Sequence, residues 1–329
     1  MIITRTPLRV SFVGGGTDMP SFYKRHGGAV VSMAIDKYIY ISINKKFDGR
    51  IRLSYSKTEN VDKASELKHD LARACLEMYN LTGVEIISVS DIPGEGSGLG
   101  SSSAFVVGLL HAISEYVAEP CHSRHILAEK AYMIELGCGH PVGKQDHYAS
   151  AYGGLHFFKF LKNDKVEVEP ICFQNGEEKD FQDQLMLFWT GKTRKASSIL
   201  KKQSENISDI GNAEKIAINM RDLAYQLKSD LLFGGIYNFG EYLHQNWELK
   251  KELAENISNE WFDKMYAHAR SMGATGGKLC GAGGGGFLLL CAEPDYQRGL
   301  EASMAVCFSL KMIPIRMSEE GSKIIYEQA

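Results

Sequence analysis

The chain has 329 residues, a length that favours two domains, and its 44% hydrophobic and 23% charged residues exclude a disordered, charge-rich protein. Lys and Arg number 37 against 40 Asp and Glu, a net charge of −3, so no global positive field attracts nucleic acid or an anionic membrane. Any phosphate group must therefore be held by a local site.

The N-terminal half is predicted to alternate strands and helices around glycine-rich turns. β-Branched and aromatic residues predict strands over 8–13, 29–44 and 84–90. A helix is expected after the glycines that follow the third strand, with Ser101 as its cap, and another over 123–136.

The C-terminal half changes character after a polar, acidic stretch near residues 175–183. We expect the domain boundary there, with domains at 1–180 and 181–329. The predicted elements are a strand at 185–189, helices with apolar stripes at 216–231 and 261–269, two strands joined by glycines within 278–292, a helix from Pro294 and a strand at 312–317.

The seven cysteines form no CxxC pair and no metal-ligand spacing, which favours reduced thiols. The first residues lack the basic start and apolar run of a signal peptide, and no stretch is apolar enough to predict a membrane span. We therefore expect a cytoplasmic protein without membrane or nucleic-acid partners.

Glycine is unusually frequent, with 33 residues, and concentrates at 14–16, 94–100 and 281–286. This clustering indicates tight backbone sites rather than a flexible linker. At 94–100, glycines recur at every second position before a predicted helix, so backbone N–H groups and the helix N-terminus could bind a polyphosphate. A tight loop with only a structural role is the alternative.

The third cluster satisfies GxGxxG literally, but a strand-like run follows it where a dinucleotide site needs a helix. The Walker A pattern and the protein-kinase motifs are absent from the sequence. Near the middle of the chain, Glu135 and Asp146 flank a glycine and proline turn, and magnesium-dependent phosphoryl transfer needs two such carboxylates. Solvated surface acids are the alternative, and His140 and His147 are expected to be ordinary histidines rather than metal ligands.

Three segments, in this order, resemble the motifs of the GHMP kinase superfamily. They are residues 6–10 together with 14–18, residues 93–104 and residues 278–286. The resemblance spans nearly the whole chain and implies an α+β, two-domain GHMP kinase fold. In that fold a ribosomal S5 domain 2-like N-terminal domain precedes a ferredoxin-like α/β C-terminal domain, with the active site between them.

The resemblance also implies roles for individual residues. The ATP phosphates would be bound by Gly94, Gly96, Ser97, Gly98, Leu99, Gly100, Ser101 and Ser102. Ser102 and Glu135 would coordinate Mg²⁺, although an extra serine in this motif leaves a neighbouring hydroxyl as the alternative ligand. Asp146 would face the acceptor hydroxyl, as a base or as an orienting group, with Arg9 beside it. The acceptor would be bound by Gly16, Thr17, Asp18 and Gly283.

Residues 14–18 and 189–197 are most similar to the branch of the superfamily that phosphorylates heptose 7-phosphates, with fucokinase-like enzymes nearby. The expected function is therefore transfer of the ATP γ-phosphate to the C1 hydroxyl of D-glycero-D-manno-heptose 7-phosphate. A substrate with its own phosphate needs a cation remote from C1, and Arg194, with Lys192 and Lys195 nearby, is the candidate. Solvated surface cations are the alternative there.

Three other functions stay open at this point. They are a fucokinase-like or other sugar 1-kinase, a diphosphomevalonate decarboxylase with the same fold, and a non-catalytic sugar sensor. The expected partner is a small sugar phosphate, and the chain is expected to be a monomer or homodimer.

Overall fold

The computed structural model describes residues 1–93, 96–173, 176–193, 196–208 and 211–328. Within these residues an eight-stranded sheet has the order β12-β1-β2-β5-β3-β4, and β6 pairs with β2 and β7. The strands are β1 (Ile2–Val13), β2 (Gly28–Lys45), β3 (Ile51–Ser54), β4 (Thr58–Val61), β5 (Val84–Ser90), β6 (Leu155–Phe160), β7 (Val166–Pro170) and β12 (Lys323–Glu327).

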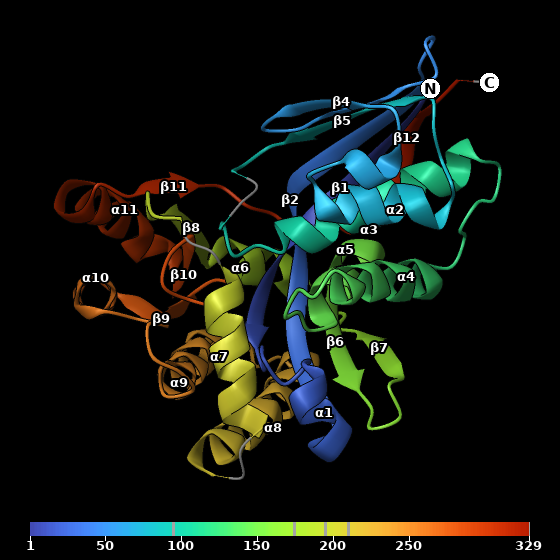
Figure 1. Ribbon diagram of the computed structural model, residues 1–329. Helices are drawn as coiled ribbons and strands as arrows, with labels where there is room; N and C mark the ends of the chain where they lie inside the picture. The colour runs from blue at the N-terminus through green and yellow to red at the C-terminus, as the bar shows by residue number, and fades with distance from the viewer. Residues whose placement is uncertain (94–95, 174–175, 194–195, 209–210, 329) are drawn as a thin grey trace.

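Helices cover this sheet, and Figure 1 shows α2 to α5 gathered on one side of the long strands β1 and β2. The helices of this half are α1 (Pro20–His26), η1 (Ala64–Glu66), α2 (Asp70–Met78), α3 (Ser101–Tyr116), α4 (Arg124–Gly137) and α5 (Gln145–Tyr152). The strand β1 contacts α3 and α5 as well as α8 and α9 of the C-terminal half, so its second half is buried continuously instead of alternating.

A four-stranded antiparallel sheet with the order β11-β8-β10-β9 forms the second part. Its strands are β8 (Leu185–Trp189), β9 (Ala274–Leu279), β10 (Phe287–Ala292) and β11 (Lys311–Ile313). The helices around it are α6 (Glu177–Asp183), α7 (Ala196–Ser208), α8 (Asn212–Leu232), η2 (Ile236–Asn238), α9 (Phe239–Lys251), α10 (Glu260–Ser271) and α11 (Pro294–Phe308). Within the described ranges, no helix combines the length and apolar character needed to cross a bilayer.

Strands and helices in both halves confirm the α+β prediction, and most predicted elements are present. Two local predictions are wrong. The strand expected at 312–317 ends at Ile313 because Pro314 has no N–H to donate, and Met317 forms only an isolated bridge with Ile35. Ser101 is the first residue of α3 rather than its cap, a position that Gly100 takes in the left-handed conformation. The domain limits at 180 and 181 stay a prediction, since β12 returns to pair with β1.

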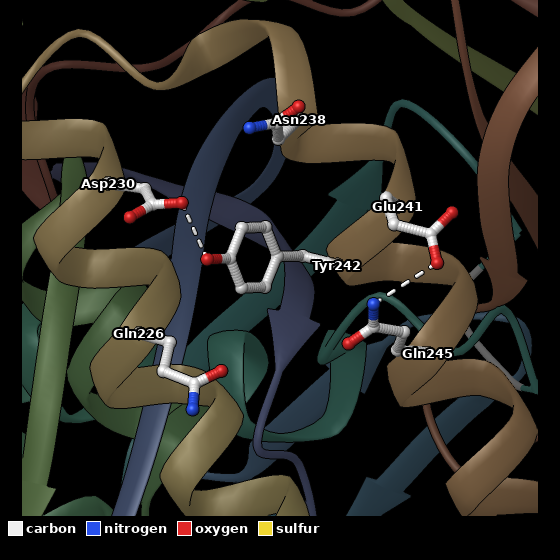
Figure 2. Close-up of a pocket in the computed structure, with 6 residues that line it drawn as sticks. All are labelled: Gln226, Asp230, Asn238, Glu241, Tyr242 and Gln245. Atoms are coloured by element: carbon white, nitrogen blue, oxygen red, sulfur yellow. Dashed lines mark hydrogen bonds between the residues drawn. The ribbon is translucent and has the colours of Figure 1, made fainter.

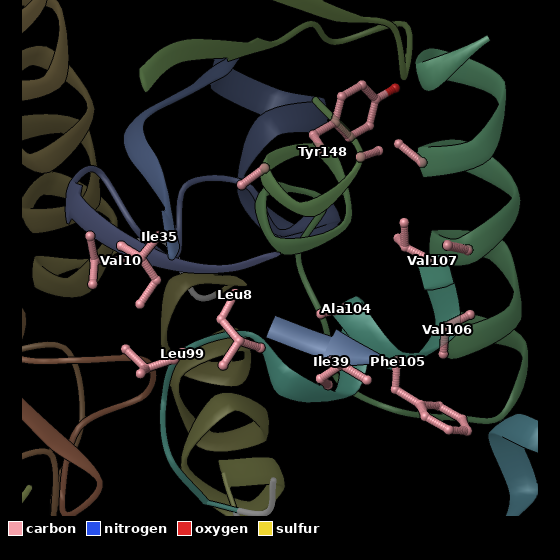
Figure 3. Packing of buried hydrophobic residues seen from close by; sticks show 14 of the residues in the cluster. Leu8, Val10, Ile35, Ile39, Leu99, Ala104, Phe105, Val106, Val107 and Tyr148 are labelled. Carbon is pink, nitrogen blue, oxygen red and sulfur yellow. The ribbon is translucent and has the colours of Figure 1, made fainter. Parts of the chain in front are cut away.

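The core of the larger sheet reaches the second glycine cluster. Leu99 is fully buried and points into the hydrophobic cluster that contains Leu8 and Val10, as Figure 3 shows. A glycine-rich segment is thereby fixed to the interior by one apolar side chain.

Candidate active site

The glycine-rich segment at 96–100 leads directly into the N-terminus of α3. Gly96, Gly98 and Gly100 have φ angles of 71°, 77° and 76°, a region that favours glycine. No side chain caps α3, and its first turn carries no acidic residue. The first N–H groups of a helix lack intrahelical partners and carry positive partial charge. The segment therefore has the backbone conformation and the uncapped helix N-terminus that an anion site needs, and binding of a phosphate there stays a prediction.

The inner side of this loop is held by the protein itself. The Ser97 and Ser101 hydroxyls lie 2.8 Å apart, and the carbonyl of Leu99 accepts a hydrogen bond from the backbone N–H of Arg9 at 3.0 Å. Ser97, Leu99 and Ser101 are thus bound on the protein side, whereas Ser102 is exposed. Contact of Ser102 and of the backbone N–H groups with a ligand stays a prediction. Gly94, also predicted for this site, lies outside the described residues.

The third glycine cluster packs against the loop from the C-terminal half. A Cβ on Gly98 would lie 2.5 Å from the Cys280 carbonyl oxygen, and one on Gly281 would lie 2.5 Å from the Gly98 Cα. The Ser97 carbonyl accepts a hydrogen bond from the Phe287 N–H at 3.1 Å. Only glycines allow this approach of two backbones. Gly283 itself lies against Ile257, because a Cβ there would meet the Ile257 carbonyl oxygen at 2.6 Å.

Glu135 of α4 lies beneath the start of α3 and is 2% exposed. Its carboxylate accepts hydrogen bonds from Ser102 Oγ at 2.5 Å and Ser103 Oγ at 2.7 Å, and His147 Nε2 lies 2.8 Å from it. Burial opposes ionisation, but the contact with His147 and the two serine hydroxyls outweigh it and lower the pKa of Glu135 to about 2. Glu135 is therefore a carboxylate at neutral pH.

The donor set around Glu135 fits a magnesium ion. Mg²⁺ prefers oxygen ligands and is commonly held by one or two protein groups together with substrate phosphates. Ser102 and Glu135 supply a hydroxyl and a carboxylate beside the free N-terminus of α3, whereas Ser103 is 3% exposed and faces inward. Among Ser101, Ser102 and Ser103, Ser102 is the exposed residue.

Asp146, in the first turn of α5, forms a bidentate ion pair with Arg9 of β1. Arg9 Nε and Nη2 each donate to a different carboxylate oxygen of Asp146 at 2.8 Å. Arg9 Nη1 donates to the Gly98 carbonyl at 2.9 Å, and the residue is 3% exposed. The Asp146 side chain remains 24% exposed, so one face of the carboxylate is open beside the glycine loop.

The turn at 14–18 lies next to the start of α5. Asp18 is 2% exposed, and its carboxylate accepts hydrogen bonds from Gly16 N, Gln145 N and Gln145 Nε2 at 2.9 to 3.2 Å. Burial and the nearby charge of Asp146 raise the pKa of Asp18. Thr17 is also buried, and its hydroxyl lies within hydrogen-bond distance of the carbonyl oxygens of Gly14 in the turn and Ala29 in β2. These contacts position the turn and α5, and direct contact with an acceptor stays a prediction.

Two buried lysines behind the site were not identified from the sequence. Lys278 Nζ donates to the Phe12 carbonyl at 2.9 Å, and Lys250 Nζ donates to the Gly281 carbonyl. Burial and the charge of Lys250 hold the pKa of Lys278 well below its usual value. Lys278 thus joins β9 to the end of β1, and Lys250 joins α9 to the third glycine cluster. Lys278 stands shortly before the third glycine cluster, and this position was the feature of the sequence that could have identified it.

The structure describes only part of the cationic segment that is predicted to bind the substrate's own phosphate. Arg194 and Lys195 lie outside the described residues. Lys192 Nζ lies 3.9 Å from the centre of the Trp261 ring, a cation–π contact that gives it a partner within the protein. His140 contacts Asp70 and His147 contacts Glu135, and their expected role as ordinary histidines stays a prediction.

A polar cavity of about 230 Å³ lies apart from these residues, between α8 and α9. Figure 2 shows that four of the polar residues that line it form two hydrogen-bonded pairs. Tyr242 donates to Asp230 at 2.6 Å, and Gln245 donates to Glu241 at 3.1 Å. It contains none of the residues that the sequence predicts for function.

Comparisons with known proteins identify the family of the chain. The family model of the GHMP kinases N terminal domain matches residues 66–154, and that of the GHMP kinases C terminal matches 223–304. A D-glycero-alpha-D-manno-heptose 7-phosphate kinase from Campylobacter jejuni is 31% identical over 316 residues, 91% of each chain. An L-fucokinase/L-fucose-1-P guanylyltransferase from Bacteroides fragilis is 25% identical over 88% of this chain and 34% of its own.

The fold recurs in a solved structure. The crystal structure of a D-glycero-D-manno-heptose 1-phosphate kinase from Bacteroides thetaiotaomicron superposes with a TM-score of 0.80 over 100% of both chains, at 24% identity. The two-domain α+β architecture implied by the three motifs is therefore confirmed.

Proposed function

The chain belongs to the GHMP kinase superfamily and is an ATP-dependent kinase, and we propose that it phosphorylates the C1 hydroxyl of D-glycero-D-manno-heptose 7-phosphate. The observation that carries the kinase chemistry is the position of Arg9. Its guanidinium binds Asp146 through two N–H groups and the Gly98 carbonyl through a third. The Arg9 side chain thus fixes the distance between the Asp146 carboxylate and the glycine-rich loop at 96–100.

In this proposal Asp146 accepts a hydrogen bond from the C1 hydroxyl and aligns its oxygen with the γ-phosphorus. The oxygen–phosphorus bond forms as the bond to the leaving ADP breaks, and the hydroxyl proton passes to Asp146 or to solvent. The two hydrogen bonds from Arg9 keep the Asp146 carboxylate oriented. Positioning and charge stabilisation supply most of the rate in phosphoryl transfer, so a rigid pair of this kind suits the reaction.

The phosphate groups of ATP are assigned to the backbone N–H groups of 96–100 and the N-terminus of α3. Ser102 and Glu135 would hold Mg²⁺, which when bound neutralises charge on the transferring phosphoryl group. The uncapped helix supports the first assignment, and the low pKa of Glu135 supports the second. Few cations are then needed, in keeping with the net charge of −3.

The heptose phosphate acceptor is supported by the 31% identity with the Campylobacter jejuni kinase over 91% of both chains. The phosphate remote from C1 is assigned to the cationic segment that contains Arg194. Replacing Arg194 by Ala is expected to weaken binding of the phosphorylated sugar more than that of the unphosphorylated heptose. An equal loss for both would contradict this assignment.

The deciding experiment is a screen of acceptors with ATP and Mg²⁺ in which the rate of ADP release is measured for each acceptor. The panel contains D-glycero-D-manno-heptose 7-phosphate, the unphosphorylated heptose, L-fucose, galactose and mevalonate. We expect the heptose phosphate to give the highest kcat/KM and NMR of the product to place the new phosphate on C1. A different preferred acceptor, or phosphate on another oxygen, would overturn the assignment.

A fucokinase-like activity is the second candidate, favoured by the similarity to the fucokinase of Bacteroides fragilis. It predicts the highest kcat/KM with L-fucose in the same screen. Release of carbon dioxide from diphosphomevalonate would instead indicate a decarboxylase, and absence of sugar-stimulated ADP release would indicate a sensor.

A further inference from the structure

Four buried polar side-chain atoms without hydrogen-bond partners gather around the turn at 14–16. They are Ser11 Oγ, Gln145 Oε1, Gln203 Nε2 and Asn246 Nδ2, and the exposed fraction of each residue is 9% or less. Buried polar atoms are normally paired, so such a group needs an explanation.

Their positions relative to the glycines define the arrangement. A Cβ on Gly15 would lie 3.2 Å from Ser11 Oγ and 3.5 Å from Gln145 Nε2, and one on Gly16 would lie 2.3 Å from Gln203 Nε2. Asn246 lies at the other end of the turn, where its Oδ1 accepts the Gly14 N–H at 3.0 Å. Elements from both halves of the chain thus present polar groups to three consecutive glycines.

Existing contacts fix which ends of two amides are free. Asn246 uses Oδ1 for Gly14, so the unpaired atom is its Nδ2 donor. Gln145 uses Nε2 for Asp18 at 3.2 Å, so the unpaired atom is its Oε1 acceptor. With the Gln203 donor and the Ser11 hydroxyl, the group contains both donors and acceptors and carries no charge. Hydroxyl groups, which donate and accept at once, complement such a set.

We propose that Gln203 of α7 and Asn246 of α9, with Gln145 and Ser11, recognise the hydroxyl groups of the acceptor beside the one that reacts. The inference rests on the proposed sugar kinase function and deepens it, because it defines this end of the acceptor as a neutral polyol. A carboxylate such as that of mevalonate would find no cation among these four groups. The acceptor phosphate must then lie away from this turn.

Burial adds a consequence for α7. Gln203 is 1% exposed against Gly16, so an acceptor hydroxyl reaches it only when α7 shifts away from the turn. Ser204 Oγ donates to Ser21 Oγ at 3.0 Å and Arg25 Nη2 donates to the Ile207 carbonyl at 2.5 Å, which ties α7 to α1. These contacts restrict the shift to one that α1 and α7 accommodate together.

The test replaces Gln203 with Leu in the full chain and uses Gln245→Leu as the matched control. Gln245 is an exposed glutamine of α9 bonded to Glu241, away from the turn. For Gln203→Leu we expect kcat/KM for the acceptor to fall by about 10-fold, the loss of one neutral hydrogen bond, while KM for ATP stays unchanged. The melting temperature should stay equal or rise, because a buried unpaired amide is removed. The control should change none of these values.

Gln203→Ala repeats the measurement with a smaller side chain, in case leucine obstructs the turn. An unchanged acceptor KM in both variants, or equal changes in the KM of acceptor and ATP with a lower melting temperature, would overturn the inference and indicate a structural glutamine.

The acceptor panel separates this inference from the proposed function. If L-fucose or another neutral sugar is preferred and Gln203→Leu weakens it selectively, the heptose assignment fails and the polyol inference stands. If mevalonate is preferred, or no sugar is bound or phosphorylated, the polyol inference is overturned.

Discussion

The two sides of the candidate active site treat polar groups in opposite ways. On the side proposed for the ATP phosphates, the phosphate side, which comprises residues 96–103 with Glu135, the serine and glutamate side chains pair with one another. The first N–H groups of α3 have no intrahelical partner there. On the acceptor side, comprising the turn at 14–18 with Ser11, Gln145, Gln203 and Asn246, four buried side-chain atoms remain unpaired. A nucleotide that all members of a family bind can be recognised by backbone groups, which do not depend on side-chain identity. An acceptor that differs between members has to be recognised by side chains, which can differ with it.

The largest effect is expected where the two sides meet, at Asp146. Replacing it with Asn keeps the shape but removes the charge that Arg9 orients, so kcat should fall by about 1000-fold, within the range for a group that handles a reacting proton. Binding of Mg²⁺ and ATP, measured by calorimetry, should change little because the substitution replaces none of the groups proposed to bind them. Turnover near that of the wild type would contradict the assignment of Asp146.

The phosphate side was predictable from the sequence to a degree that the acceptor side was not. Glycines at every second position before a helix encode a local conformation, and the structure has left-handed φ angles at Gly96, Gly98 and Gly100. The predicted Glu135 lies beside Ser102 because α4 packs against α3. Such contacts follow from short segments and one helix pair.

The acceptor side depends on elements far apart in the chain. Gln203 and Asn246 are ordinary polar residues of amphipathic helices, and no local pattern distinguishes them from surface residues. The sequence indicated Asp18 as a sugar contact, which stays a prediction, but it did not indicate that the Asp18 carboxylate also holds the turn and the start of α5. The strand β12 at the end of the chain was not predicted either, because it pairs with β1, which lies almost the whole sequence away.

The pairing on the phosphate side predicts a pH dependence of stability. The pKa of Glu135 is about 2 in the folded protein against about 4.5 when unperturbed, so its ionised form stabilises the fold above pH 4.5. This contribution, on the order of 3 kcal/mol, should be lost as the pH falls from 4.5 toward 2. Urea unfolding at a series of pH values would measure it. Glu135→Gln should flatten the profile in that range, whereas Glu255→Gln, at an exposed position, should leave it unchanged. Equal profiles for wild type and Glu135→Gln would show that the pairing does not stabilise the carboxylate.

The smallest of these effects tests whether the phosphate side is rigid because two backbones touch. Gly98→Ala introduces a Cβ 2.5 Å from the Cys280 carbonyl oxygen, at a φ of +77°. Gly49 has a similar φ of +74° but nothing within 4 Å of its Cβ position, so Gly49→Ala isolates the backbone strain. We expect Gly98→Ala to lower the free energy of unfolding by about 2 kcal/mol more than Gly49→Ala, the cost of overpacking, and to raise KM for ATP. KM for the acceptor should change less, because the turn at 14–18 does not contact this residue directly. Equal destabilisation by the two substitutions would mean that the loop yields to the added methyl group, and the rigidity assigned to the phosphate side would then have to come from Leu99 and Arg9 alone.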